Sequence, residues 1–380
     1  MPDYTADKRN GKRMMPEKNR NMAETAREAA KTEVRQKKRK KRRRLYLVPI
    51  VIIFISLGVI WLMGQVRPPE QKQPSANQPV PTPTPDTSNS DPDRPTSETG
   101  ALDGTHTLRD GVYTLLLIGK RDGNTDTLMV AMLDTEKGEL NVVSIPRDTV
   151  VDVSRRIPKI NGAYNDAGGG AAGIEQLRTE MSQIVGYIPG SYACVNMQGF
   201  VDLVDAVGGV QFDVPVRMKK LSEGINLQPG SQLLNGDEAL QLVRYRGYSS
   251  QLMEEVGINH DDYGRMQVQQ MFLKALAEQT LTLSNIGKIP EFLKIADQNL
   301  ETDLSAGNLA WFARQVKDIG TENLHFYTLP TVSVDYSGED ASHGYYENIV
   351  HDQAMEMINA YINPYTAPVT DNMVTHRQLG

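Results

Sequence analysis

The stretch VYTLLLIGKRDGNTDTLMVAMLDTEKGELNVVSI, residues 112–145, decides the fold. Three apolar runs within it, at 112–118, 127–133 and 140–145, are separated by segments rich in Gly, Asp and Asn. Short apolar runs between turn residues are typical of strands. We therefore predict three consecutive strands near the start of the folded domain.

The chain beyond residue 145 mixes further strands with helices. Short apolar runs predict strands at 192–196, 210–214 and 324–329. Apolar residues at helical spacing predict helices at 171–185, 198–207, 237–245, 264–283 and 304–319. Asn235 is expected to cap the helix at 237–245, and Gly247 to end it. These elements indicate an α/β fold with a mixed central sheet flanked by helices, an α-β-α sandwich.

Composition limits this domain to about residues 109–365. That length suits one domain, and the sequence shows no internal repeat. Residues 65–108 are rich in Pro, Ser and Thr, so they cannot bury a core and are expected to form a disordered, extended linker. Residues 366–380 are expected to form a polar C-terminal tail.

Residues 45–64, LYLVPIVIIFISLGVIWLMG, form a twenty-residue segment without a charge. A helix of about 20 residues crosses a hydrocarbon core of roughly 30 Å, so one transmembrane helix is expected here. A secretory signal peptide would have a shorter apolar core and a small-residue cleavage site. The helix is therefore expected to remain in the protein.

Charge is divided unequally about this segment. Residues 1–44 contain 17 Lys and Arg against 6 Asp and Glu, and residues 35–44 are all basic except Gln36. By the positive-inside rule the basic tail is cytoplasmic and the main domain extracytoplasmic, which places the protein in the cell membrane as a single-pass protein. The alternative is that the basic run binds nucleic acid or membrane lipid itself. The rest of the chain is acidic, which argues against a nucleic-acid partner for the main domain.

Few residues offer redox or covalent chemistry. The single cysteine, Cys194, excludes an intrachain disulfide and is expected to be a buried structural thiol. The six histidines show no metal-ligand spacing, and no nucleophile-elbow motif supports a covalent hydrolase.

Carboxylates and cations follow several predicted strand and helix ends. Asp122 and Asp126 share the loop at 119–127 and could hold a hard cation such as Mg²⁺, the alternative being an ordinary solvated turn. Arginine and lysine side chains could bind phosphate oxygens, the alternatives being surface ion pairs and helix-end charges. These cations are Arg147, Lys159, Arg244, Arg246 and Arg265.

Seven ordered blocks resemble the LytR-CpsA-Psr family of cell-envelope proteins over residues 112–283. They read LLLIG, TDTLMV, VVSIPRDT, KINGAY, GFVDLVDAVGGVQFDVP, LNGDEALQLVRYR and DYGRMQVQQ. The resemblance implies a Mg²⁺-dependent phosphotransferase that moves a glycopolymer, such as wall teichoic acid or capsule, from a polyprenyl-pyrophosphate carrier to peptidoglycan.

The resemblance also implies roles for individual residues. Asp122 and Asp126 fall on the metal-binding aspartates, although the loop between Gly119 and Thr127 is shorter than is usual in the family. Asp122 or Asp148 would accept the acceptor's proton beside the catalytic Arg147. The pyrophosphate-binding set is Arg147, Lys159, Arg244, Arg246, Arg265 and Gln269. Val268 stands where many relatives have another arginine.

Two other functions use the same residues. A pyrophosphate hydrolase would take water as the acceptor, and a non-catalytic binding or regulatory protein would only capture the anion. All three require Arg147, Arg244 and Arg246 to lie within about 15 Å of one another, because a pyrophosphate cannot bridge more. Residues 200–207 would either line a trough for the polyprenyl chain or pack in the core.

Overall fold

The computed structural model describes residues 66–71, 106–121, 124–248, 256–258, 261–280, 289–335 and 344–379. The expected cytoplasmic tail, transmembrane helix and most of the expected linker lie outside these ranges, as does Asp122. Within these ranges, no helix has the length and apolar character needed to cross a membrane.

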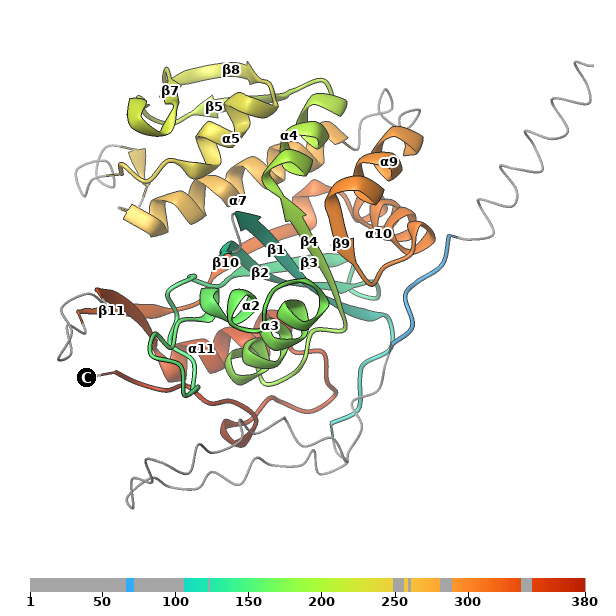
Figure 1. The fold of residues 1–380 in the computed structure, drawn as a ribbon. Coiled ribbons are helices and arrows are strands. Elements are labelled where there is room, and N and C mark those ends of the chain that lie inside the picture. Colours follow the sequence, from blue (N-terminus) through green and yellow to red (C-terminus); the bar gives the residue numbers. More distant parts are fainter. Residues whose placement is uncertain are drawn as a thin grey trace, which may run out of the picture. The chain divides into compact units, whose positions relative to one another are not determined.

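A six-stranded mixed sheet forms the centre of the domain, in the order β10-β3-β2-β1-β4-β9 (Figure 1). β1 pairs antiparallel with β2 and parallel with β4, and β3 pairs antiparallel with β2 and parallel with β10. The strands are β1 (Val112–Arg121), β2 (Asn124–Asp134), β3 (Glu139–Ser144), β4 (Ser191–Asn196), β9 (Leu300–Thr302) and β10 (Leu324–Thr328). The predicted mixed α/β sheet is confirmed, and β9 is an additional edge strand.

Helices cover both faces of this sheet. Leu116 and Val130 belong to one core with Ile174 and Leu177 of a helix, whereas Met129 packs on the opposite face. Both faces are apolar because both are covered, which explains the nearly continuous apolar runs of β1 and β2. The first face carries α2 (Ala163–Asp166), α3 (Gly170–Val185) and α11 (His351–Met357), followed by a π-helical turn at Ile358–Ile362 (Figure 1).

A second core lies in a lobe beyond the other face. There Phe212, Leu242 and Phe272 pack together, and Leu273 of the same long helix contacts the sheet. The lobe's helices are α4 (Met197–Ala206), α5 (Gly236–Arg244) and α7 (Asp261–Thr280). Its strands are β5 (Val210–Val214), β6 (Met218–Lys220), β7 (Ile225–Leu227) and β8 (Gly230–Leu234). The lobe and the sheet together enclose the cavity described below.

The remaining elements close the domain. Helices α9 (Ile289–Asn299) and α10 (Ala306–Ile319) flank β9, and the hairpin of β11 (Thr331–Asp335) and β12 (Tyr345–Ile349) precedes α11. Residues 366–380 were expected to form a polar tail, but they continue the fold as far as residue 379. Val369 and Leu379 are buried, and the Thr375 amide donates to the Gln183 carbonyl of α3.

Candidate active site

An irregularity in the β1–β2 hairpin presents Asp126. Gly119 pairs with Thr127 and Lys120 pairs with Thr125, so Asp126 has no partner across the hairpin. A bulge of this kind disrupts the ladder and re-aims a side chain, and bulges are common beside active sites. The side chain of Asp126 therefore departs from the regular alternation of side chains between the two faces of the sheet.

Four arginines from separate elements converge on Asp126. Its Oδ1 lies 2.7 Å from Arg147 Nη1 and 3.7 Å from Arg246 Nη2, and its Oδ2 lies 3.2 Å from Arg121 Nη2. Arg265 donates to the Asp126 backbone carbonyl at 3.3 Å. Arg121 and Arg246, more than a hundred positions apart in the sequence, therefore contact the same carboxylate. These contacts are short enough for one pyrophosphate to reach both arginines.

Asp262 supports two of these arginines from the start of α7. Its carboxylate accepts from Arg265 Nη2 at 2.8 Å and lies 3.6 Å from Arg246 Nε. The Arg265 side chain is nearly fully buried, and its Nε has no hydrogen-bond partner among the described residues. One buried donor, Nε, is thus left for a further acceptor while Nη2 is already hydrogen-bonded, which suits an anionic ligand.

Asp148 and Lys159 form a second layer behind Arg147. Asp148 lies 3.4 Å from Arg147 Nε and 3.1 Å from Lys159 Nζ. The Lys159 ammonium also stands over the Tyr346 ring, 4.6 Å from its centroid. Arg147, Asp148 and Lys159 do not line the cavity that Arg121, Arg244, Arg246 and Arg265 border, and Arg147 is connected to it through Asp126. Asp148 therefore lies next to Arg147, and Lys159 is linked to Arg147 through Asp148.

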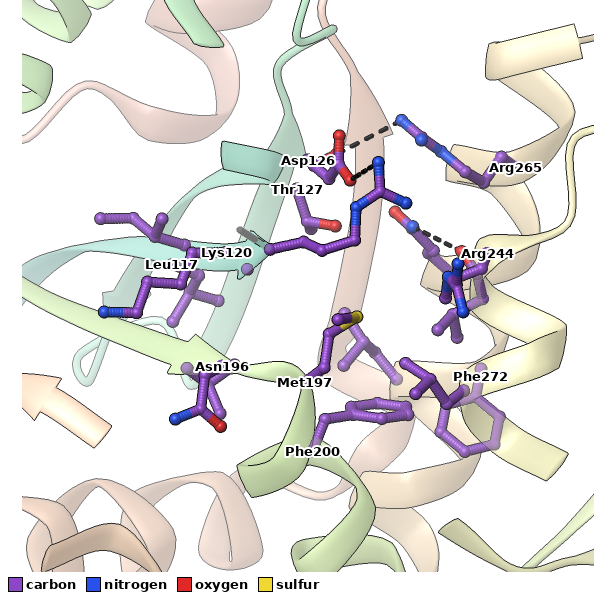
Figure 2. A pocket seen from close by; sticks show the side chains of 18 of the residues that line it. Leu117, Lys120, Asp126, Thr127, Asn196, Met197, Phe200, Arg244, Arg265 and Phe272 are labelled. Atoms are coloured by element: carbon purple, nitrogen blue, oxygen red, sulfur yellow. Dashed lines mark hydrogen bonds and ion pairs between the residues drawn. The ribbon is translucent and has the colours of Figure 1, made fainter. Parts of the chain in front are cut away.

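A cavity of about 350 Å³ opens between the sheet and the lobe. Figure 2 shows Phe200 and Phe272 at one end of it and Asp126, Arg244 and Arg265 at the other. Its apolar walls come from β1, β2, β4, α4, α5 and α7, and include Leu117, Met129, Val195, Met197, Leu240, Val243 and Leu273. The cavity is amphipathic, with an apolar body and a cationic end.

Phe200–Val207, the segment weighed as a trough, divides between two environments. Phe200 lines the cavity, whereas Val204 and Val207 are buried in the core of the lobe. Core packing is therefore observed for this segment, with Phe200 also packed against the core, and a trough for the polyprenyl chain stays a prediction for Phe200.

Arg244 and Gln269 border the cavity where α5 and α7 meet. The Arg244 Nε is buried without a hydrogen-bond partner among the described residues. Gln269 donates to the Val243 carbonyl at 2.9 Å, which ties α7 to the last turn of α5. Gln269 therefore holds the end of the helix that presents Arg244.

Charge and burial shift the pKa values in the cluster. Burial alone would raise the pKa of Asp126, but the hydrogen bond from Arg147 and the charge of Arg121 hold that pKa below its usual range. Burial lowers the pKa of Arg265 to about 10, so Arg265 remains a cation at neutral pH. Burial together with the nearby Arg147 also lowers the pKa of Arg246. The cluster is a charged site at neutral pH.

The donor set can be tested for a fit to Mg²⁺. Within the described residues, no three His, Cys, Asp or Glu side chains gather into a metal site. Mg²⁺ bound with phosphates uses one or two carboxylates and takes its other oxygens from the phosphates and water. Asp126, at the cationic end of the cavity, could supply one carboxylate of such a partial donor set, and in the free protein both of its oxygens are contacted by arginines.

Four charged cavity residues, Lys120, Arg121, Lys220 and Glu223, were not predicted as site residues. Arg121 lies across the β1–β2 hairpin from Asp126, a closeness that a hairpin prediction for residues 119–127 would have shown. Lys220 and Glu223 come from the short β6–β7 hairpin. No motif marks those two positions.

Several curated proteins are similar to this chain. It is 27% identical over 346 residues to a polyisoprenyl-teichoic acid–peptidoglycan teichoic acid transferase TagU of Oceanobacillus iheyensis, covering 88% of this chain and 97% of TagU. It is 29% identical over 260 residues to the cell wall biosynthesis protein LcpA of Corynebacterium glutamicum, covering 62% of this chain. It is 31% identical over 209 residues to the corresponding transferase TagV of Bacillus subtilis, covering 50% of this chain. The matches span about half the length of LcpA and of TagV, 48% and 50%.

Solved structures share the fold. The B. subtilis TagV structure has a TM-score of 0.55 at 24% identity, covering 67% of this chain and 96% of TagV. The structure titled TagT bound to LIIa-WTA has a TM-score of 0.53 at 20% identity, covering 66% of this chain and 89% of TagT. The model of the LytR_cpsA_psr family matches residues 85–362. With most of its length matched, and with the mixed sheet common to these structures, the chain belongs to the LytR_cpsA_psr family.

Proposed function

We propose that this protein is a membrane-anchored phosphotransferase that attaches a glycopolymer from a polyprenyl-pyrophosphate carrier to peptidoglycan. Relatives named as teichoic acid–peptidoglycan transferases support wall teichoic acid as the polymer class. One observation carries the proposal: an apolar cavity of about 350 Å³ ends at a cluster of arginines. Such a cavity matches an amphiphile with a long hydrocarbon chain and a strongly anionic head.

The apolar body of the cavity suits the polyprenyl chain. Phe200, Met197 and Phe272 present hydrocarbon and aromatic surface without charge along its length. Binding an isoprenoid there removes apolar surface from water on both partners, which is favourable by about 25 cal/mol per Å². The cavity volume lies in the range of roughly 300–1,000 Å³ that is common for small-molecule sites.

The arginines suit the pyrophosphate. In the free protein Arg147, Arg121 and Arg246 share the single charge of Asp126. A pyrophosphate brings more negative charge and more acceptor oxygens, and planar guanidinium groups bind such oxygens in pairs. Arg244, whose Nε is unsatisfied, is available for the same anion. Positioned cations of this kind stabilise the charge that develops in phosphoryl transfer.

The reaction makes one phosphorus–oxygen bond and breaks another. A hydroxyl oxygen of peptidoglycan attacks the phosphorus that bears the glycan, and polyprenyl phosphate leaves with the bridging oxygen. The hydroxyl proton passes to a carboxylate, for which Asp148 and Asp122 are the candidates. Mg²⁺ held by Asp126 and Asp122 would neutralise part of the charge on the departing phosphate. The product is a phosphodiester between glycan and wall.

The transfer can be measured directly with the full chain. Polyprenyl-pyrophosphate glycan, Mg²⁺ and purified peptidoglycan are supplied, and glycan that remains covalently bound to the washed wall is quantified. Arg147→Ala is expected to lower the rate by on the order of a hundredfold, as loss of an oxyanion-stabilising donor does in other enzymes. The matched control is Arg314→Ala, because Arg314 is an exposed arginine of α10 paired only at the surface. Equal rates for both variants, or no attachment by the unsubstituted chain, would contradict the proposal.

A further inference from the structure

A short hairpin beside the cavity exposes a leucine directly after two lysines. β6 and β7 are joined by a single 3₁₀ turn at Leu221–Glu223. Leu221 is 67% exposed, although leucine is normally among the most buried residue types. Lys219 and Lys220 precede it and are also exposed. We call Met218–Leu227 the tip hairpin.

The tip hairpin borders the cationic end of the cavity. Lys220 and Glu223 both line the cavity and pair with each other at 2.6 Å. The hydrogen bond from Lys220 lowers the pKa of Glu223, and the charges of Arg244 and Arg246 lower it further. In the sequence, Leu221 therefore lies between two residues that line the cavity.

The exposed leucine is held in place by its base. Met218, Ile225 and Leu227 are buried in the core of the lobe. Arg217 donates to the Met218 carbonyl at 3.0 Å and to the Leu227 carbonyl, which ties the two strands together. Because these residues fix the base of the tip hairpin, its turn exposes the Leu221 side chain to solvent.

We propose that the tip hairpin docks the rim of the cavity onto the surface of an anionic lipid bilayer. Lys219 would contact lipid headgroups while Leu221 enters the boundary with the acyl chains, as in other interfacial anchors, and Lys220 stays paired with Glu223 at the cavity. The proposal rests on the proposed function, since a lipid-linked donor must pass from the bilayer to the cavity. Charge complementarity favours an anionic bilayer over an apolar protein partner. Glu223, the one acidic side chain in the turn, already pairs with Lys220, which leaves Lys219 beside Leu221 without an ion pair among the described residues.

Site-specific labelling tests the docking without any transfer assay. The native Cys194 is fully buried and burial raises its pKa to about 12, so it reacts poorly with thiol reagents. Leu221→Cys can then be labelled with an environment-sensitive fluorophore in the full chain, with Val332→Cys as the matched control. Val332 is an apolar residue of β11, 53% exposed, outside the tip hairpin. The unsubstituted chain gives the labelling blank.

The labelled chains are reconstituted with vesicles that contain phosphatidylglycerol and brominated acyl chains. Quenching at position 221 is expected to exceed quenching at position 332 at least about twofold, and to decline when zwitterionic lipid replaces the anionic lipid or salt is raised. Equal quenching at both positions overturns the proposal. A response at position 221 to peptidoglycan fragments but not to vesicles also overturns it, and assigns the tip hairpin to the acceptor.

A second variant separates docking from catalysis. Leu221→Asp is expected to lower transfer from a vesicle-borne donor several-fold while leaving transfer from a short-chain, water-soluble donor unchanged. If Leu221→Asp lowers both rates equally, the tip hairpin acts within the site and docking is refuted. If the unsubstituted chain transfers from neither donor, the proposed function fails, whereas the quenching comparison still decides the docking.

Discussion

Asp126 neutralises its arginines only in part. Three guanidinium groups lie within 4 Å of its two carboxylate oxygens, and a fourth binds its backbone. Cations so close repel one another, and Asp126 and Asp262 reduce that repulsion in the free protein. The cluster therefore gains most from a ligand with several negative charges.

Replacing Arg147 with lysine tests whether guanidinium geometry matters beyond charge. Arg147→Lys keeps the cation but loses the planar fork, so the affinity for inorganic pyrophosphate is expected to fall about tenfold, or about 1.4 kcal/mol. Isothermal titration calorimetry measures the affinity for pyrophosphate, with Arg314→Lys as the control. Unchanged affinity would mean that Arg147 contributes only charge, or does not contact the anion.

The pH dependence of stability tests the Asp126 pairing. The pKa of Asp126 is lower in the folded chain than in the unfolded one, so its charge stabilises the fold at pH values above its unfolded pKa. This stabilisation is lost as the pH falls through the lowered, folded pKa. In urea titrations in detergent, the difference in unfolding free energy between the unsubstituted chain and Asp126→Asn is expected to be constant from pH 8 to about 5 and to shrink in more acidic buffer. A difference that grew on acidification would reverse the assigned sign.

The sequence suggested the arginines but not their common partner. Arg244 ends a helix whose apolar spacing and cap were recognisable, and Arg246 follows two residues later, so their neighbourhood was predictable. The bulge at Asp126 depends on how β1 and β2 pair, and one residue of register is not encoded by composition. The convergence of Arg147 and Arg265 on Asp126 likewise depends on tertiary packing.

Helices and strands with long apolar patterns were predictable, and short ones were not. The helix expected at 304–319 begins at Ala306, because Ser305 caps it through a capping box with Asn308. The helix expected at 264–283 is observed as Asp261–Thr280 among the described residues. β6, β7 and β9 have three residues each, too few for a periodic signal.

The cap of α5 offers a test at the level of one element. Asn235 accepts from the Glu238 amide and the Glu238 carboxylate accepts from the Asn235 amide, a complete capping box. Asn235→Ala is expected to lower the free energy of unfolding by about 1 kcal/mol. Asn235→Ser is expected to retain most of the stability that the cap contributes, because serine is also a good N-cap residue. Denaturant titration compares the two variants. Equal losses for Ala and Ser would show that the cap hydrogen bond is not the source of the stability.

At the scale of the whole molecule, the proposed anchor and the proposed site would serve one substrate. The proposed transmembrane segment at 45–64 would confine the domain near a lipid-linked donor, and the linker would let it reach the wall, which raises effective concentration without new contacts. The tip hairpin would in addition orient the domain, with its cavity rim against the bilayer.

Removal of residues 1–64 tests the anchor. The truncated chain is expected to leave the membrane fraction after a carbonate wash and to transfer more slowly from vesicle-borne donor than the full chain, because its local concentration is lost. Fractionation and the transfer assay measure the two effects. A truncated chain that stayed with the membranes after the wash would place the anchor elsewhere.

The fate of the glycan-bearing phosphorus tests the central claim most directly. A donor labelled with ³²P at that phosphorus is incubated with the full chain, Mg²⁺ and peptidoglycan, and the label is followed into wall and soluble fractions. Transfer predicts label in a wall-bound phosphodiester, in an amount equal to the polyprenyl phosphate released. Label found only in a soluble glycan phosphate would show hydrolysis and contradict the account.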